Sequence, residues 1–435
     1  MKNTSALRCG ALAALLSLTA ALAVPELVVT PKNNTGVYQP NEPIAWTVAA
    51  RGAGADALQS ARYVLKLGGA TPAGQGTLQF SGGIATLSTT LKEPCSVLAE
   101  ITAKTADGKE LKALGGAVVA PEKLKPSAPC PANFDAFWNG KIAELAAVPP
   151  HPVLAPASSG KDGVQYWQLT MDNIRGTKIH GHLARPAQGQ KFPAILFVQY
   201  AGVYPLPKNS AVGAAGEGWL ALNISAHDLP LEEAQAFYDQ QNNGPLKNYV
   251  ALGNDDVEKS YFLRMFLACH RAVDYLASRP DWNGKTLVVS GTSQGGLQAF
   301  VTAGLNHKVS AMLALVPAGL DNTGALAGRR PGWPYWMNNA AGKNEAQALE
   351  TSKYFDGVNF AARVKCPALV GIGLIDTTSP PSGVWSGFNL TQGPKEVVVL
   401  PLSDHRGHGN SQAPYHVREK AWRAALLHDQ PPPVK

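Results

Sequence analysis

The chain has 435 residues and a mass of 45.8 kDa, enough for two or three ordinary domains. Hydrophobic residues make up 45% of the sequence and charged residues only 16%, so a large core can form and extensive disorder is excluded. The formal net charge of +7 comes without any run of Lys or Arg, which argues against nucleic acid as a partner, because that function needs clustered basic residues.

Residues 1–23 have the pattern of a secretory signal peptide. Lys2 and Arg8 precede an apolar run from Ala11 to Ala23, which ends in the small-x-small pattern of a cleavage site. The run is short for a membrane-spanning helix, so a retained anchor is the weaker alternative. We therefore predict cleavage after Ala23, a secreted or periplasmic mature protein, and no membrane association once the signal is removed.

The next segment, residues 24–121, reads as all-β. Short alternating runs such as Ile44–Val48, Tyr63–Leu67 and Val97–Lys104 are separated by glycine-rich turn signals. Several short strands in about 100 residues predict a small immunoglobulin-like β-sandwich. The segment contains no histidine and no catalytic pattern, so three roles stay open: orienting the rest of the chain, covering its cleft, or binding polysaccharide. A proline-rich linker, residues 122–131, follows.

From residue 132 to 430 the pattern becomes α/β. Phe134, Trp138, Ile142 and Leu145 are spaced as on one face of a helix. Buried strand-like runs then alternate with helical stretches, the clearest of which is Glu258–Ser278. These runs lie at residues 194–198, 220–224, 287–290, 312–316, 368–375 and 397–400. The alternation predicts a mostly parallel sheet covered by helices on both faces. Residues 431–435 are a proline-rich tail.

A nucleophilic serine is indicated at position 293. The run Thr286–Ser290 leads into Gly291-Thr292-Ser293-Gln294-Gly295 and then into a helix-like stretch. This is a G-x-S-x-G pattern in the strand–turn–helix context of a nucleophile elbow. The strained turn needs small neighbours two positions away, and the backbone N–H of Gln294 then points at the developing oxyanion. A glycine-rich turn that only packs helix against sheet is the alternative.

A serine nucleophile needs a base and an acid that orients it. In α/β-hydrolases the chain order is Ser, then Asp or Glu, then His, on turns that follow later strands. Asp376 ends the apolar run 368–375 and His405 follows the run 397–400, so we predict the triad Ser293, Asp376 and His405. His408 is the competing histidine, but it lies between Gly407 and Gly409, where a mobile backbone would hold a base poorly.

The second oxyanion donor is expected on the loop after the strand 194–198, as the N–H of Ala201 with Tyr200 the near alternative. Candidate substrate-binding residues are Tyr200, His227 and Trp336. Trp336 belongs to an aromatic stretch that reads equally well as a sugar-stacking cleft or as a packed loop.

No metal site is predicted. His180 and His182 lie in a strand-like stretch and read as two structural histidines on one face. The mature chain keeps Cys95, Cys130, Cys269 and Cys366, with no C-x-x-C pair and no Cys/His cluster. Four cysteines are too few for a disulfide scaffold, and the sequence does not identify which of them could pair outside the cytoplasm.

Residues 130–430 resemble the acetyl xylan esterase and cephalosporin-C deacetylase family, carbohydrate esterase family 7. Four segments carry the resemblance: the helix start Pro131–Trp138, the stretch Ile179–Leu183, the motif Gly-x-Ser-Gln-Gly-Gly at 291–296, and Pro401 followed by His405. Three others depart from it. Ser225-Ala226-His227 replaces the family's Arg-Gly-Gln, Gln199-Tyr200-Ala201 its His-Gly-Tyr, and His405-Arg406 its His-Glu.

The resemblance implies an α/β-hydrolase fold and a serine esterase that removes acetyl groups from acetylated polysaccharide or oligosaccharide through an acyl-enzyme. It implies no metal or organic cofactor and leaves the oligomeric state open, a homo-oligomer included. Two other functions remain: a serine peptidase of the prolyl-oligopeptidase kind, for which the β segment is too short to form a propeller, and a catalytically dead carbohydrate-binding protein, against which the intact Ser293, Asp376 and His405 argue.

Overall fold

The computed structural model describes residues 24–52 and 58–435, so the predicted signal peptide lies outside the described residues. Residues 24–119, here called the β-rich region, contain two sheets with strand orders β1-β3-β6 and β2-β8-β7-β4-β5. The buried side chains of the two sheets, among them Ile44, Trp46, Val97 and Ile101, form one shared core. The strands are β1 (Glu26–Pro31), β2 (Val37–Tyr38), β3 (Pro43–Arg51), β4 (Ser60–Leu67), β5 (Thr71–Gln79), β6 (Ile84–Thr90), β7 (Cys95–Lys104) and β8 (Glu110–Val119).

A short connection leads from the β-rich region into the rest of the chain. It contains the 3-10 turn η2 (Pro121–Lys123) and ends at helix α1 (Phe134–Ala146). Phe134 and Trp138 are fully buried, as the helical spacing predicts, and their rings contact Phe360 edge-on at 5.0 and 5.2 Å. This aromatic cluster anchors helix α1, the first helix of the α/β region, to the interior of that region.

The α/β region is built on a nine-stranded sheet with the order β17-β16-β15-β14-β12-β13-β11-β10-β9. The six strands β12 to β17 run parallel to one another, whereas β9, β10 and β11 form an antiparallel edge. The mostly parallel sheet predicted from the sequence is therefore confirmed. The strands are β9 (Val153–Ala157), β10 (Val164–Asp172), β11 (Lys178–Pro186), β12 (Phe192–Val198), β13 (Leu220–Ile224), β14 (Trp282–Thr292), β15 (Ala311–Leu315), β16 (Ala368–Gly373) and β17 (Lys395–Leu400).

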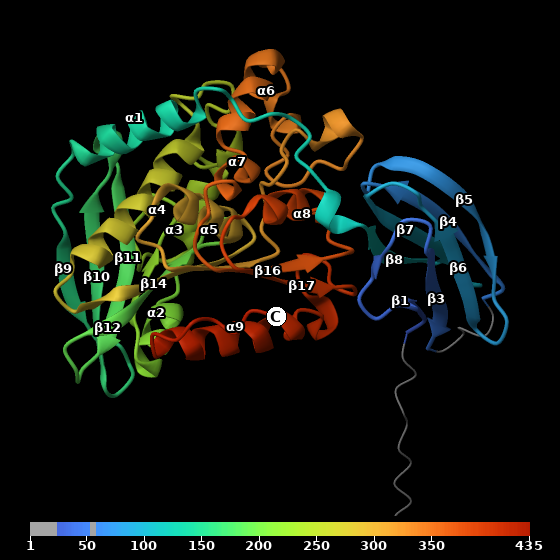
Figure 1. Cartoon of the computed structure of the whole chain (residues 1–435), viewed down its shortest axis with the longest axis horizontal. Coiled ribbons are helices and arrows are strands. Elements are labelled where there is room, and N and C mark those ends of the chain that lie inside the picture. The colour runs from blue at the N-terminus through green and yellow to red at the C-terminus, as the bar shows by residue number, and fades with distance from the viewer. Residues whose placement is uncertain (1–23, 53–57) are drawn as a thin grey trace, which may run out of the picture.

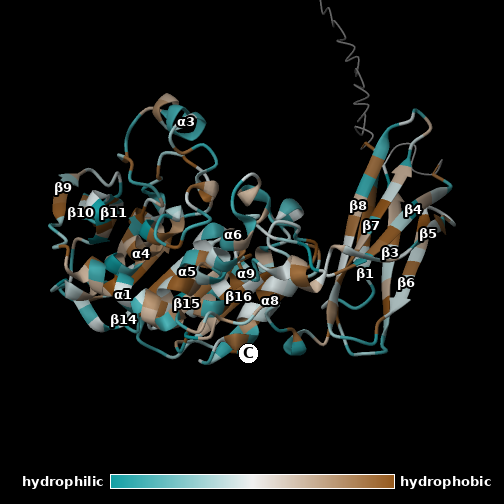
Figure 2. Ribbon diagram, turned by 90° about the horizontal axis from the view of Figure 1, so that it is seen from above, coloured by the Kyte–Doolittle hydropathy of each residue, from teal (hydrophilic) through white to brown (hydrophobic). Residues whose placement is uncertain are grey.

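Helices cover both faces of this sheet (Figure 1). On one face lie α2 (Asn209–Glu217) and α9 (Ala413–Leu427), and on the other α4 (Tyr261–Ser278), α5 (Gln294–Leu305) and α8 (Pro381–Leu390). Strands such as β15 are buried at every residue, and Figure 2 shows hydrophobic residues running along the central strands. The remaining helices, α3 (Gln235–Asn243), α6 (Glu345–Tyr354) and α7 (Gly357–Ala361), belong to longer excursions between strands.

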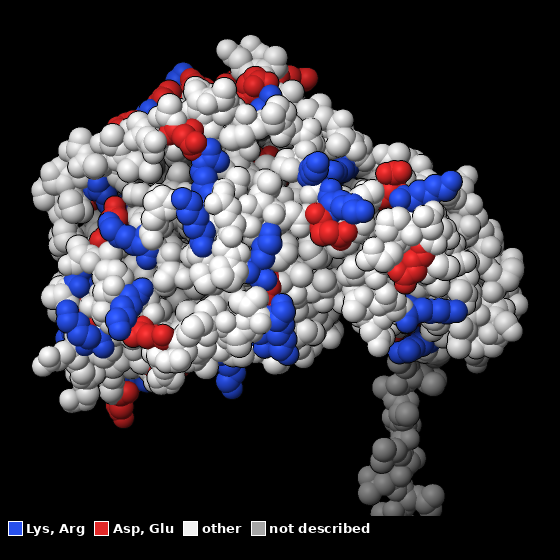
Figure 3. Space-filling view, in the orientation of Figure 1, with Lys and Arg blue, Asp and Glu red and all other residues white. Residues whose placement is uncertain are grey.

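The surface carries charge of both signs. On the face shown in Figure 3, basic and acidic side chains are interspersed over the described residues. Within residues 24–52 and 58–435, no helix is both long and apolar enough to cross a membrane.

Candidate active site

Ser293 lies at a sharp turn between β14 and α5. Its φ of 59° is in the left-handed region, which a non-glycine residue adopts only at an energetic cost. A Cβ added to Gly291 would lie 2.3 Å from the carbonyl carbon of Gly295, and one added to Gly295 would lie 2.4 Å from the Val198 oxygen. Both neighbours must therefore be glycine, which is the steric demand of a nucleophile elbow.

The three predicted triad residues are brought together at the carboxyl ends of parallel strands. His405 Nε2 lies 2.7 Å from Ser293 Oγ, and His405 Nδ1 lies 2.7 Å from Asp376 Oδ2. Asp376 is only 2% exposed. Its other oxygen accepts hydrogen bonds from the backbone N–H groups of Thr378 and Ser379 at 2.8 and 2.7 Å, which turns Oδ2 toward the imidazole.

His408 does not take part in this arrangement. Its side chain is exposed and its Nδ1 pairs with the carboxylate of Asp404. Of the two neighbouring histidines, only His405 contacts both a hydroxyl nucleophile and a buried carboxylate.

The loop after β12, which carries Ala201, contacts the start of α5, which carries Gln294. Gln294 is the first residue of α5, so its N–H stands at the positive end of a helix. The buried amide side chains of Gln294 and Gln298 both donate to the Gln199 carbonyl, at 3.3 and 2.9 Å, and hold the loop after β12 against the elbow.

Within that loop, the Gly202 N–H donates to the Tyr249 hydroxyl at 3.4 Å. In the described part of the chain, the N–H groups of Tyr200, Ala201, Val203 and Tyr204 have no acceptor. The predicted donor Ala201 and its alternative Tyr200 therefore both stay open, and Val203 and Tyr204 join them as candidates. Loop sequence alone does not show which of these amides are already used inside the protein.

Tyr200 presents an aromatic face beside this loop. It is 52% exposed, and its inner face stacks on Tyr204 with ring centroids 4.7 Å apart. The Tyr204 hydroxyl lies 3.1 Å from Gln199 Oε1 and from the Tyr200 carbonyl oxygen, which fixes the pair in place. The outer face of Tyr200 is a surface on which a sugar ring can stack.

Two other predicted substrate-binding residues need correction. Trp336 is 3% exposed, its indole N–H donates to the Asn254 carbonyl at 2.8 Å, and its ring stacks on Phe262 and Phe355. No face remains for a sugar, because the aromatic stretch packs into the core. The packed-loop alternative is thus the correct one for Trp336.

His227 is also buried. Its Nδ1 lies 2.7 Å from the Tyr261 hydroxyl and its Nε2 3.0 Å from the Gly202 carbonyl oxygen. Burial lowers the pKa of His227 to about 4, so the ring is neutral at neutral pH. Because both ring nitrogens are used inside the protein, His227 supports the loop that carries Ala201 instead of binding substrate.

The two histidines of the strand β11 make hydrogen bonds inside the fold. His182 lies between the Tyr166 hydroxyl and the Leu206 carbonyl, and His180 lies 3.1 Å from Asp228 Oδ1. The four cysteines of the described chain are free thiols. Residues 24–52 and 58–435 contain no group of three or more His, Cys, Asp or Glu side chains placed to hold a metal ion.

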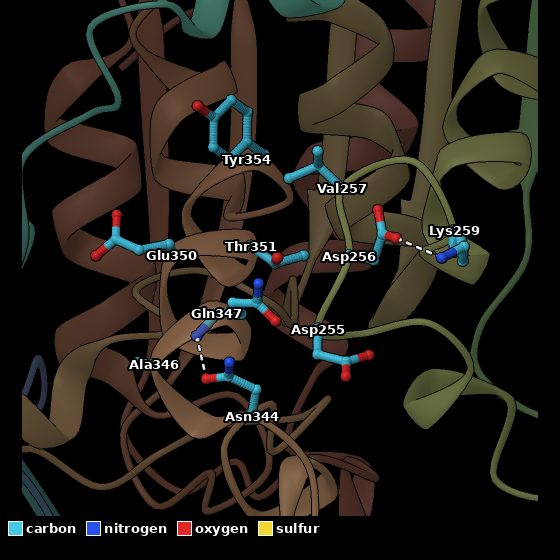
Figure 4. Close-up of a pocket in the computed structure, with 10 residues that line it drawn as sticks. All are labelled: Asp255, Asp256, Val257, Lys259, Asn344, Ala346, Gln347, Glu350, Thr351 and Tyr354. Carbon is cyan, nitrogen blue, oxygen red and sulfur yellow. Dashed lines mark hydrogen bonds and ion pairs between the residues drawn. The ribbon is translucent and has the colours of Figure 1, made fainter.

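A separate pocket of about 740 Å³ lies where the segment before α4 faces α6 (Figure 4). Its lining includes Asp255, Asp256 and Glu350, and no triad residue. Asp256 pairs with Lys259 at 2.8 Å, so part of its charge is already neutralised within the pocket wall.

The fold and the serine at the elbow define the class of the protein: it is an α/β-hydrolase. Residues 121–422 match the sequence profile of the acetyl xylan esterase family (AXE1), and the chain belongs to that family. The resemblance inferred from the sequence is thereby confirmed, and membership places the chain among carboxylic ester hydrolases. The β-rich region lies outside the match.

The chain is also similar to individual acetyl esterases and acetyl xylan esterases. The chain is 33% identical over 301 residues to the acetyl esterase Axe7A of Xylanibacter ruminicola, a match that covers 66% of this chain and 66% of that protein's length. The acetyl xylan esterase structure from Paenibacillus sp. R4 superposes with a TM-score of 0.60 at 25% identity, over 70% of this chain and 97% of that one. Acetyl xylan esterase 1 from Thermoanaerobacterium sp. JW/SL YS485 shares the fold, with a TM-score of 0.58 at 21% identity over 68% and 96% of the two chains.

Proposed function

We propose that this protein is a serine esterase that removes acetyl groups from xylan-type polysaccharide or its oligosaccharides through a Ser293–His405–Asp376 triad. The observation that carries the proposal is the pair of 2.7 Å contacts that link the three side chains at a nucleophile elbow. The proposal is supported by the acetyl xylan esterase family match and by the similarity to the acetyl esterase Axe7A.

In the first half of the reaction, Ser293 Oγ attacks the ester carbonyl carbon while His405 Nε2 accepts the hydroxyl proton. Asp376 stabilises the imidazolium that forms. The negative charge develops on the former carbonyl oxygen, where the Gln294 N–H and a free amide of the 199–204 loop donate to it. The intermediate collapses to an acetyl-serine, and the sugar hydroxyl leaves with the proton from His405.

In the second half, water attacks the acetyl-serine and His405 takes its proton. The second tetrahedral intermediate breaks down to acetate, and His405 returns the proton to Ser293 Oγ. Each step uses the serine as nucleophile and the histidine as proton carrier, so the reaction calls for no metal or organic cofactor.

The exposed face of Tyr200 offers a place for the sugar that bears the ester. A pyranose ring that stacks on a tyrosine is held in one orientation, but stacking alone does not distinguish one sugar from another. We therefore expect Tyr200→Ala to raise KM for acetylated xylo-oligosaccharides and to leave KM for p-nitrophenyl acetate nearly unchanged.

The proposed function is tested by substrate comparison. The purified protein is assayed for acetate release from acetylated xylan, and in parallel against methyl glucuronate esters, feruloyl esters and peptides, with Ser293→Ala as the blank. Acetate release should be the fastest reaction and should disappear in the variant. Faster cleavage of peptides or of feruloyl esters would refute the assignment.

Two further proposals concern the chain outside the active site. We propose that residues 24–121 form an immunoglobulin-like domain, joined through a linker at 122–131 to a catalytic domain at 132–430, and that residues 1–23 are a signal peptide that directs secretion or periplasmic export. The two packed sheets of the β-rich region support the first. N-terminal sequencing of the exported protein tests the second, and should read from Val24.

A further inference from the structure

The β-rich region contacts the loop that carries Asp376. This loop, residues 374–380 and here called the acid loop, follows β16 and faces β8 and the turn before β2. A Cβ added to Gly116 would lie 2.3 Å from the Leu374 carbonyl oxygen, and one added to Gly36 would lie 2.5 Å from Leu374 Cδ1. The backbone of the β-rich region therefore packs directly on the residue two positions before Asp376.

A second contact reaches the residue after Asp376 through Arg330. The Arg330 N–H donates to the Gly68 carbonyl at 2.9 Å, and its Nε donates to the Thr377 carbonyl at 3.2 Å. The first residue of β5 also contacts the chain just before Arg330, because Thr71 Oγ1 donates to the Gly328 carbonyl at 2.8 Å. Arg330 thus joins a turn of the β-rich region to the acid loop.

The rest of this boundary is closely packed. Ser96 Oγ and Ser382 Oγ are 2.6 Å apart and buried, which links β7 to α8. Val118 on β8 belongs to the same hydrophobic cluster as Leu374 and Trp385. Asp376 itself borders the narrow crevice between the two regions, together with Gly68 and Arg330. In Figure 1 the β-rich region is seated against the β16 and β17 end of the sheet.

We propose that the β-rich region is part of the catalytic centre, and that Arg330 is a positioning residue through which it holds the carboxylate of Asp376. The inference rests on the proposed triad. Its physical basis is that the direction of Asp376 Oδ2 is set by backbone N–H groups of the acid loop, at Thr378 and Ser379. If movement of the acid loop displaced the Asp376 carboxylate by about 1 Å, the rate of the catalysed reaction would fall on the order of a hundredfold.

The first test is Arg330→Ala, with Arg330→Lys as the conservative partner. Removing the Nε donor releases the Thr377 carbonyl but leaves the backbone contact with Gly68. We expect kcat for p-nitrophenyl acetate to fall about tenfold with KM unchanged within twofold. The lysine variant should recover part of the loss, because its ammonium is also a donor of sufficient length.

A double-mutant cycle with Asp376→Asn separates positioning from a general structural effect. If Arg330 acts through Asp376, then Arg330→Ala should have little further effect once the carboxylate is gone. The rate of acetyl-serine formation is measured with the enzyme in excess over substrate, so that variants with very low activity can still be compared. A loss that is as large in the Asp376→Asn background as in the wild type would overturn the assignment of Arg330.

The second test alters the β-rich region itself. Gly116→Ala places a methyl group against the Leu374 carbonyl, so β8 and the acid loop must move apart. If the β-rich region holds the acid loop in place, kcat should fall at least tenfold. Gly74→Ala is the matched control in the same region, because its Cβ meets only Leu65 Cδ1 at 3.8 Å, an ordinary contact. The control should keep kcat within twofold, and thermal melting shows whether each variant is folded.

The outcomes distinguish this inference from the proposed function. If Ser293→Ala and Asp376→Asn keep a tenth of the activity, the triad itself is wrong. If those two variants are inactive while Arg330→Ala and Gly116→Ala keep wild-type kcat, the triad stands and the role of the β-rich region is overturned. If Gly116→Ala does not fold, the Arg330 cycle alone decides.

Discussion

Asp376→Asn gives the sharpest test of the site. The carboxylate accepts three hydrogen bonds: from the N–H groups of Thr378 and Ser379 on Oδ1, and from His405 Nδ1 on Oδ2. An asparagine would keep its oxygen on the two backbone donors and point its NH₂ group at the imidazole. His405 Nδ1 must then accept, the proton moves to Nε2, and the ring donates to Ser293 where it should accept.

The expected loss in kcat is on the order of 10⁴, which corresponds to about 5.4 kcal/mol of transition-state stabilisation. KM and the melting temperature should change little, because the amide is nearly isosteric with the carboxylate and satisfies the same backbone donors. Steady-state hydrolysis of p-nitrophenyl acetate measures the rate, and reaction with a fluorophosphonate probe reports the reactivity of Ser293.

Asp404→Asn is the matched control. Asp404 is a neighbour of His405 in sequence, but its carboxylate pairs with the exposed His408. This variant should keep kcat within about twofold. Equal losses in the two variants, or less than a tenfold loss in Asp376→Asn, would refute the assignment of Asp376 as the residue that orients the base.

Four further predictions follow from the same structure. Ser293→Ala should fold normally and lose on the order of 10⁴–10⁶ in kcat; a retained tenth of the activity would exclude the serine as nucleophile. His405→Ala should abolish turnover, whereas His408→Ala should cost less than about tenfold, or 1.4 kcal/mol; the reverse pattern would transfer the role of base. Acetate esters should be hydrolysed faster than octanoate esters, and a series of p-nitrophenyl esters would show the opposite order if this is wrong. Because burial lowers the pKa of His227 to about 4 from 6.5, the unfolded chain binds this proton first. The free energy of unfolding should therefore decrease by up to about 3 kcal/mol as the pH is lowered from about 6.5 to 4. Denaturant titrations at several pH values should show a flatter profile for His227→Gln, and an unchanged profile would contradict the argument.

Much of the fold could be predicted because its signals are local. Continuous apolar runs that alternate with helical spacing require a covered parallel sheet, and the strand runs near residues 194–198 and 220–224 coincide with β12 and β13. The elbow is equally local, since the need for glycine at 291 and 295 arises from a single turn. The order Ser293, Asp376, His405 could be predicted for a related reason, because parallel strands end at the same edge of the sheet and bring their following turns together.

The aromatic and oxyanion assignments needed the tertiary structure. From the sequence, the aromatic stretch from Trp333 to Trp336 could line a cleft or pack into the core. Only the stacking of Trp336 on Phe262 and Phe355 shows that Trp336 belongs to the core. His227 is similar, because a histidine after a strand gives no sign of which groups its nitrogens meet. The free N–H of Val203 could not be found from sequence, since a backbone amide has no side-chain signature.

The sequence by itself determined the class of fold, the strand–turn–helix setting of Ser293 and the family, because each depends on residue types at short, fixed spacings. Only the tertiary structure decided that the β-rich region lies against the acid loop. Gly116 and Leu374 are 258 positions apart in the chain, and no pattern in either segment refers to the other. Their contact arises from the docking of one hydrophobic core on another, and such docking depends on the shape of both surfaces after each has folded.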